Sequence, residues 1–216
     1  MKRRLRVLLF SAVICLVSLG VAVDVYAAET VDDHVQKALK LSRENKLKDA
    51  LLEFEAALKI EPNNVTALTG AGLTCNMLKQ VGPAVAYLEK AANVSPNDAE
   101  VFYHLGYMYY KAGKYNDAIS TMNKSLALRP NNESVYYDLG LVYWKMGDDA
   151  NAIASYDKAV QINPRFADGY FDLGEFYLAK GDKQKAKYNY DKAKTLYKEL
   201  GREEDVKYID EQLKKL

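Results

Sequence analysis

Four prolines of this chain stand 34 residues apart, a regularity that few folds can produce. They are Pro62, Pro96, Pro130 and Pro164. Small residues recur in the same frame, at positions 8 and 20 of repeats that begin at Val31, Val65, Ala99, Glu133 and Ala167. Position 8 holds Ala38, Gly72, Gly106, Gly140 and Gly174, and position 20 holds Ala50, Ala84, Ala118, Ala152 and Ala186. A fixed period of this length predicts five copies of one structural unit, stacked so that neighbours bury a continuous core.

The pattern inside each repeat predicts two helices. Positions 4, 7, 8 and 11 follow the spacing of one helical face, as Phe102, Leu105 and Tyr109 illustrate. A glycine such as Gly113 follows the first helix, where a left-handed residue ends a helix at little cost. The recurring proline ends the second helix because it has no backbone N–H for a further turn. We expect the small residues at positions 8 and 20 to face each other, so that Gly140 meets Ala152 where two antiparallel helices approach closely.

These features resemble the tetratricopeptide repeat, a helix–turn–helix unit of the same length. The closest agreement is in the fourth repeat, at Tyr136, Leu139, Gly140, Tyr143, Ala152, Tyr156, Ala159 and Pro164. The fifth repeat follows with Tyr170, Leu173, Gly174, Tyr177, Ala186, Tyr190 and Ala193, but has Lys198 in place of the closing proline. The resemblance implies an all-α fold, a right-handed α-solenoid of five repeats at residues 31–64, 65–98, 99–132, 133–166 and 167–200.

Residues 201–216 form one more amphipathic segment after Gly201. Val206, Ile209, Leu213 and Leu216 lie on one stripe, which predicts a capping helix over the open end of the fifth repeat. The alternative is a helix that binds a membrane or calmodulin. Such a helix would have a basic polar face, whereas the charges here are mixed.

The N-terminus carries the pattern of a signal peptide. Lys2, Arg3, Arg4 and Arg6 precede the uncharged run from Val7 to Val23. We predict that residues 1–27 are a signal peptide, with cleavage between Ala27 and Ala28 and a periplasmic or secreted product. The alternative is an inner-membrane signal anchor that stays uncleaved; the uncharged run is short for a spanning helix.

Composition argues against several functions. A formal net charge of +1 gives little electrostatic attraction for the phosphate backbone of nucleic acid, so we expect no nucleic-acid partner. His34 and His104 are seventy residues apart and have no second ligand at i+3 or i+4 on the same helix, so we expect no metal site and no cofactor. Cys75 occupies a core position, which favours a small buried hydrophobe over a catalytic thiolate. We therefore expect no enzyme activity.

Four N-x-S/T sequences, at Asn64, Asn93, Asn123 and Asn132, leave two interpretations open. They would be glycosylation candidates in a eukaryotic secretory protein. Asparagine also caps helices and forms turns between repeats, which is the interpretation that their place beside the prolines favours.

A second stripe of each first helix cannot be buried inside its own repeat, and in proteins similar to this one it lines a concave groove. Its candidate binding residues are Tyr103, Tyr107, Tyr110, Tyr137, Asp138, Trp144, Phe171, Asp172 and Glu175. Exposed rings would give contact area at low entropy cost. Alternatively, the rings pack between neighbouring helices, as aromatics at helical spacing usually do. The acids favour a partner that combines apolar with basic residues, a peptide segment or an amphipathic helix.

The resemblance implies a protein-interaction scaffold or adaptor, which the predicted export would place in a bacterial cell-envelope assembly. The alternative is a regulatory accessory subunit of an envelope enzyme. The family's carboxylate clamp for chaperone tails uses Lys and Asn where this chain has Val35, Leu39 and Gly70, so that ligand is not expected.

Overall fold

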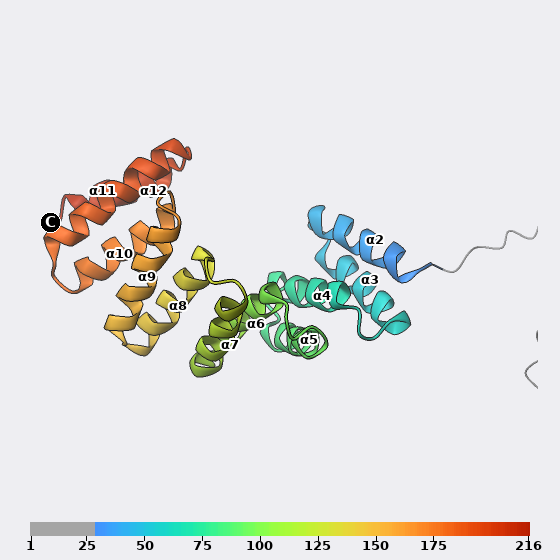
Figure 1. The fold of residues 1–216 in the computed structure, drawn as a ribbon. Helices are drawn as coiled ribbons and strands as arrows, with labels where there is room; N and C mark the ends of the chain where they lie inside the picture. Colours follow the sequence, from blue (N-terminus) through green and yellow to red (C-terminus); the bar gives the residue numbers. More distant parts are fainter. Residues whose placement is uncertain (1–28) are drawn as a thin grey trace, which may run out of the picture. The chain divides into compact units, whose positions relative to one another are not determined.

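The computed structural model describes residues 29–216. The predicted signal peptide, with its cleavage site at Ala27 and Ala28, lies outside these residues. The described part of the chain contains eleven helices and no strand, which confirms the all-α fold (Figure 1). Between residues 29 and 216, no helix has both the length and the apolar character that crossing a membrane requires.

Ten of the helices form five hairpins, and one further helix follows them. The hairpins are α2 (Val31–Arg43) with α3 (Leu47–Ile60), α4 (Val65–Met77) with α5 (Val81–Val94), α6 (Ala99–Lys111) with α7 (Tyr115–Leu128), α8 (Glu133–Met146) with α9 (Asp149–Ile162), and α10 (Ala167–Ala179) with α11 (Lys183–Glu199). Each second helix packs against the first helix of the next hairpin, and α2, α4, α6 and α8 contact one another in turn. The expected solenoid of helical hairpins is therefore confirmed.

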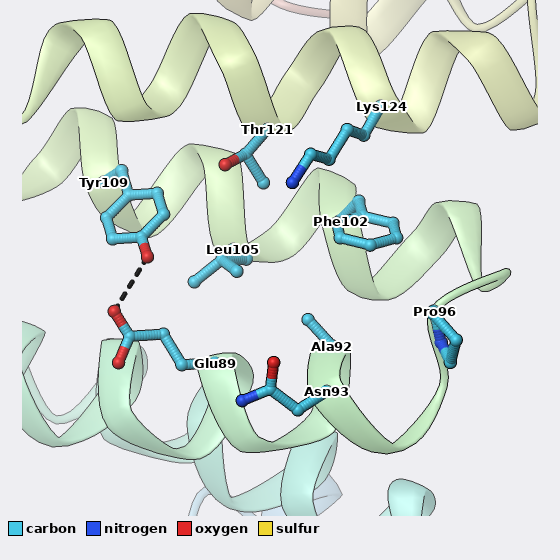
Figure 2. Close-up of a pocket in the computed structure, with 9 residues that line it drawn as sticks. All are labelled: Glu89, Ala92, Asn93, Pro96, Phe102, Leu105, Tyr109, Thr121 and Lys124. Atoms are coloured by element: carbon cyan, nitrogen blue, oxygen red, sulfur yellow. Dashed lines mark hydrogen bonds between the residues drawn. The ribbon is translucent and has the colours of Figure 1, made fainter.

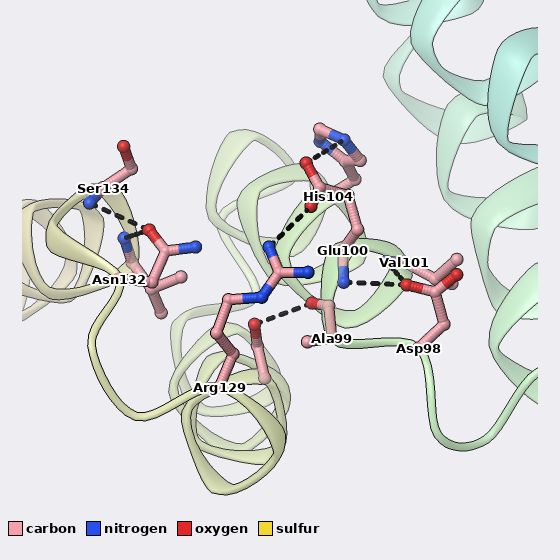
Figure 3. Close-up of polar contacts among 10 residues, drawn as sticks. Asp98, Ala99, Glu100, Val101, His104, Arg129, Asn132 and Ser134 are labelled. Atoms are coloured by element: carbon pink, nitrogen blue, oxygen red, sulfur yellow. Dashed lines mark hydrogen bonds and ion pairs between the residues drawn. The ribbon is translucent and has the colours of Figure 1, made fainter.

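Short polar side chains cap the N-termini of most first helices after α2. Asp98 accepts hydrogen bonds from the backbone N–H groups of Glu100 and Val101, and Asn132 does the same for the start of α8 (Figure 3). Asn64 caps α4 in the same way. Two of the four N-x-S/T asparagines are thus helix caps, because a side-chain oxygen there satisfies N–H groups that have no partner within the helix.

The turn between the two helices of every hairpin contains a left-handed residue at position 15. Glycine occupies it in three repeats, as Gly113, Gly147 and Gly181, with φ of 74° to 78°. Asn45 and Lys79 occupy it in the first two repeats, with φ of 58° and 61°. The turn geometry is therefore the same in all repeats, although only glycine adopts it without a steric penalty.

The small residue at position 8 lies beneath the large side chain at position 24. A Cβ atom added to Gly140 would lie 2.6 Å from the ring of Tyr156, and one added to Gly174 would lie 2.6 Å from the ring of Tyr190. The predicted pairing of Gly140 with Ala152 is thus incomplete, because ring atoms of Tyr156 are the nearest neighbours. Ala152 is itself fully buried in the same hairpin.

The last repeat differs from the others where its sequence does. α11 has 17 residues, against 14 in the other second helices, because Lys198 replaces the proline that ends them. α12 (Glu203–Leu213) packs on α11 through the buried side chains of Val206 and Ile209. Arg202 also donates a hydrogen bond to Asp168 of α10 at 2.8 Å, so the end of the fifth hairpin is covered.

Lys79→Gly should raise the free energy of unfolding by about 1 kcal/mol, since glycine removes the Cβ penalty of the left-handed conformation. Urea denaturation followed by circular dichroism measures this change. Lys90→Gly, in the exposed interior of α5, is the matched control and should lower the same quantity by about 1 kcal/mol. Equal losses at the two sites would contradict the assignment of position 15 as a left-handed turn.

Candidate protein-binding surface

The predicted binding residues all lie on α6, α8 and α10, the first helices of repeats 3 to 5. We call the outward stripe of the first helices the first-helix face; it consists of positions 2, 5, 6, 9, 12 and 13. Tyr103, Tyr107, Tyr110, Tyr137, Trp144, Phe171, Asp172 and Glu175 are half-buried on it. Asp138 is the exception, because only 5% of it is exposed.

The rings of this face contact other rings of the same chain. Tyr137 packs edge-on against Phe166 with ring centroids 5.1 Å apart, and Trp144 lies 6.1 Å from Phe176. Phe171 contacts Tyr190, Tyr197 and Tyr208. Each of these rings therefore packs against a neighbouring helix and also keeps part of its surface exposed to solvent.

Tyrosines and aspartates of successive repeats pair at a spacing of 35 residues. Burial raises the pKa of Asp138 to about 7, and hydrogen bonding with Tyr103 partly opposes this rise. Burial likewise raises the pKa of Asp172 to about 6, with Tyr137 as its hydrogen-bonding partner. Burial therefore disfavours the charged form of both acids, and most strongly that of Asp138.

Glu175 is held by tyrosines of the fifth repeat and of α12. The Tyr190 hydroxyl donates a hydrogen bond to its carboxylate at 2.6 Å. Tyr208 of α12 is 41% exposed and lies near Glu175. Partial burial is the main cause of its raised pKa, and the charge of Glu175 is the second cause. The carboxylate of Glu175 is thus bonded to a neutral hydroxyl group.

The first-helix face of repeats 1 to 3 has a different character. A hollow of about 300 Å³ lies there, and Leu39, Val65, Leu73 and Val101 are among its lining residues. Thr69 also lines it, and its side-chain oxygen is buried without a hydrogen-bond partner in the described part of the chain. The hollow suits an apolar side chain, although Asp98 and Glu100 also line it.

A surface that the sequence analysis missed lies between α5 and the α6–α7 hairpin (Figure 2). This outer hollow has a volume of about 510 Å³, and across it the Tyr109 hydroxyl donates to Glu89 at 2.7 Å. Residues 34 positions later, including Tyr136, Leu139 and Tyr143, line a similar hollow of about 310 Å³. One sequence signal could have revealed the outer hollow. Tyrosine recurs at position 11 in repeats 3 to 5, each time 20 residues after a polar side chain.

The thiol of Cys75 lies in the core, between side chains of the second repeat and its neighbours. Burial raises its pKa, with the charge of Glu55 as a second cause. A raised pKa disfavours the reactive thiolate, so this residue acts as a small hydrophobe.

Sequence profiles of one repeat family match the chain. A profile described as "TPR repeat" matches residues 106–147, and two described as "Tetratricopeptide repeat" match residues 133–166 and 155–188. No curated protein sequence matches it.

Solved structures of repeat proteins are similar to the chain. MamA is 28% identical, over 76% of this chain and 96% of its own length, with a TM-score of 0.70. PilF from Pseudomonas aeruginosa is 19% identical over 86% of this chain and 90% of its own, with a TM-score of 0.69. YrrB, described as a TPR protein with an unusual peptide-binding site, is 24% identical over 76% of this chain and 84% of its own, with a TM-score of 0.62.

The raised pKa of Asp138 predicts a pH-dependent stability. The folded state keeps the proton up to about pH 7, whereas the unfolded chain releases it near its ordinary pKa of about 4. The contribution of Asp138 to the free energy of unfolding is therefore fully present below about pH 4. It declines by on the order of 1.4 kcal/mol per pH unit as the pH rises toward 7. In urea denaturation between pH 5 and 8, Asp138→Asn should gain stability relative to the wild type as the pH rises.

Asp117→Asn, at an exposed aspartate of α7, provides the control and should follow the wild type at every pH. A constant difference between Asp138→Asn and the wild type across the range would show that Asp138 is ionised in both states.

Proposed function

Because the chain is a tetratricopeptide-repeat protein, we propose that it is a non-catalytic scaffold or adaptor that binds a segment of another protein along its first-helix face. The observation that carries this proposal is the row of half-buried aromatic side chains on α6, α8 and α10. Half-buried rings are already ordered by contacts within the chain, so binding loses little side-chain entropy. The peptide-binding site named for YrrB, a protein of similar fold, supports the same class of partner.

The partner we propose combines apolar and basic residues, as a peptide segment or an amphipathic helix. Its apolar side chains suit the hollow beside Leu39, Leu73 and Val101 and the rings of Tyr107 and Tyr110. Its basic side chains suit the half-buried acids of α10, Asp172 and Glu175, of which Glu175 accepts a hydrogen bond from Tyr190. Opposite charge adds specificity and association rate more than it adds affinity.

We further propose that the protein acts in an assembly of the bacterial cell envelope. The support is the sequence of residues 1–28, with its basic start, uncharged run and small residues at the end. A regulatory accessory subunit of an envelope enzyme would use the same surface, and identification of the partner decides between the two roles.

Tyr107→Ala should weaken binding of the native partner by more than about tenfold, because truncating a central aromatic anchor typically costs about 2 kcal/mol or more. A photo-crosslinking amino acid that replaces Tyr110 in the producing cells identifies the partner. Calorimetry with the two purified proteins then measures the affinity. Tyr188→Ala, which removes a 59% exposed ring on α11, should leave the affinity unchanged.

Full binding by a folded Tyr107→Ala protein would contradict the proposed surface. The outer hollow would then be the next surface to test, for example with Lys124→Ala.

Export has a separate test. The mature protein should begin at Ala28 and fractionate with soluble envelope proteins, and N-terminal sequencing of the purified protein checks this. A membrane-bound product that begins at Met1 would favour the signal anchor.

A further inference from the structure

The outer hollow is separate from the first-helix face. α6 contributes Phe102, Leu105 and Tyr109 to it, at positions 4, 7 and 11, and none of these positions belongs to the first-helix face. The hollow opens to solvent, because Glu89 of α5 and Lys124 of α7 are exposed at its rim (Figure 2). A ligand in the outer hollow therefore does not compete for the residues of the first-helix face.

Lys124 lines two adjoining hollows. A smaller hollow of about 210 Å³ shares Pro96, Phe102 and Lys124 with the outer hollow and adds Leu128, which is 43% exposed. The ammonium group of Lys124 lies 5.7 Å from the ring centroid of Phe102. One positive charge thus belongs to both hollows and stands beside an aromatic ring that both contain.

Several hydrogen-bond donors of the outer hollow have no partner within residues 29–216. The ammonium group of Lys124 forms no hydrogen bond or ion pair there, and the side chains of Asn93 and Thr121 form no hydrogen bond. The acid of the hollow is different, because Glu89 accepts a hydrogen bond from the Tyr109 hydroxyl at 2.7 Å. Ammonium, amide and hydroxyl groups can all donate, so this set suits a negatively charged acceptor.

The similar hollow one repeat later keeps the lysine and lacks the acid. Its position 26 is Lys158, its positions 4 and 11 are tyrosines, and Asn123 stands where the outer hollow has Glu89. Lys158 has no ion-pair partner in the described part of the chain, whereas Lys187 of α11 pairs with Asp191 at 3.2 Å. Repeats 3 and 4 thus repeat the same combination of aromatic rings and an unpaired lysine.

We propose that the outer hollow binds an acidic segment of a partner protein, in which an apolar side chain enters the hollow and a neighbouring carboxylate pairs with Lys124. The hollow beside Lys158 receives the next part of the same segment. Exposed ion pairs add little affinity, so the apolar side chain supplies most of the binding and the carboxylates supply the preference for an acidic partner.

This proposal goes beyond the proposed function and does not depend on it. The first-helix face is assigned a partner with basic residues, whereas unpaired lysines beside both outer hollows disfavour such a segment. An adaptor with two separate surfaces of opposite charge preference can hold two different partners together.

Three short peptides test the outer hollow. The probe is acetyl-Glu-Glu-Phe-Glu-Glu-amide, added at low salt to the purified, isotope-labelled protein. In an NMR titration it should shift the backbone amide signals of Asn93, Thr121 and Lys124 and leave those of Tyr107 and Tyr110 unchanged. A counterpart with Gln in place of Glu should bind at least about threefold more weakly, and one with Ala in place of Phe at least about tenfold more weakly.

Matched variants separate charge from apolar contact. Lys124→Gln should remove most of the preference for Glu over Gln, whereas Lys59→Gln, at an exposed lysine of α3 that lines neither hollow, should retain it. Asn93→Trp should fill the hollow and weaken the Glu and Gln peptides alike. Asn116→Trp, at an exposed position of α7 outside both hollows, should bind them as the wild type does.

Equal affinities for the Glu and Gln peptides, or the same loss in Lys124→Gln and Lys59→Gln, would overturn the proposal. Shifts centred on Tyr107 and Tyr110 would also overturn it, because the acidic peptide would then occupy the first-helix face. Absence of any shift up to about 1 mM peptide would do the same. Crosslinking of the native partner at Tyr110 would still decide the proposed function, since that experiment probes the other surface.

Discussion

The contact between a small residue at position 8 and a large side chain at position 24 sets the spacing of the two helices in each repeat. Leu88, Met122, Tyr156 and Tyr190 lie so close to the glycines opposite them that a single added carbon would collide with each. Close packing of this kind tolerates little change in volume. It also has a chemical consequence in the last two repeats, because a tyrosine that lies across a glycine carries its hydroxyl toward the acids near the first-helix face.

The first-helix face consequently changes character along the chain. Position 24 holds Phe54, Leu88 and Met122 in repeats 1 to 3, which bring no hydroxyl group, and the face beside them contains an apolar hollow. Tyr156 and Tyr190 bring hydroxyl groups in repeats 4 and 5, where the acids are found.

The burial of Asp138 works against the stability of the fold at neutral pH. A carboxyl group buried without a cation destabilises the fold once it is ionised, and a hydrophobic residue of similar size would remove that cost. The rings of Tyr137 and Phe171 combine packing with partial exposure, since each contacts other rings of the chain and is only half-buried.

Local pattern was sufficient to predict much of this protein. The spacing of Pro62, Pro96, Pro130 and Pro164 and the small residues at position 8 predicted helical hairpins, because they reflect steric rules that act within one repeat. Periodicity also brought Tyr103, Tyr137 and Phe171 onto one face, since stacked copies of a unit align equivalent positions.

Only the tertiary structure decided how deeply those residues are buried and what surrounds them. The sequence presented Asp138 and Asp172 as neighbouring surface charges, whereas burial raises the pKa values of both, and hydrogen bonding with tyrosines of the preceding repeat only partly opposes the rise. It paired Gly140 with Ala152 and did not predict that the ring of Tyr156 lies closest to Gly140, nor the outer hollow beside Tyr109. The physical reason is that helical periodicity assigns a side chain to a face, whereas its burial and charge state depend on groups that the neighbouring repeats bring to it.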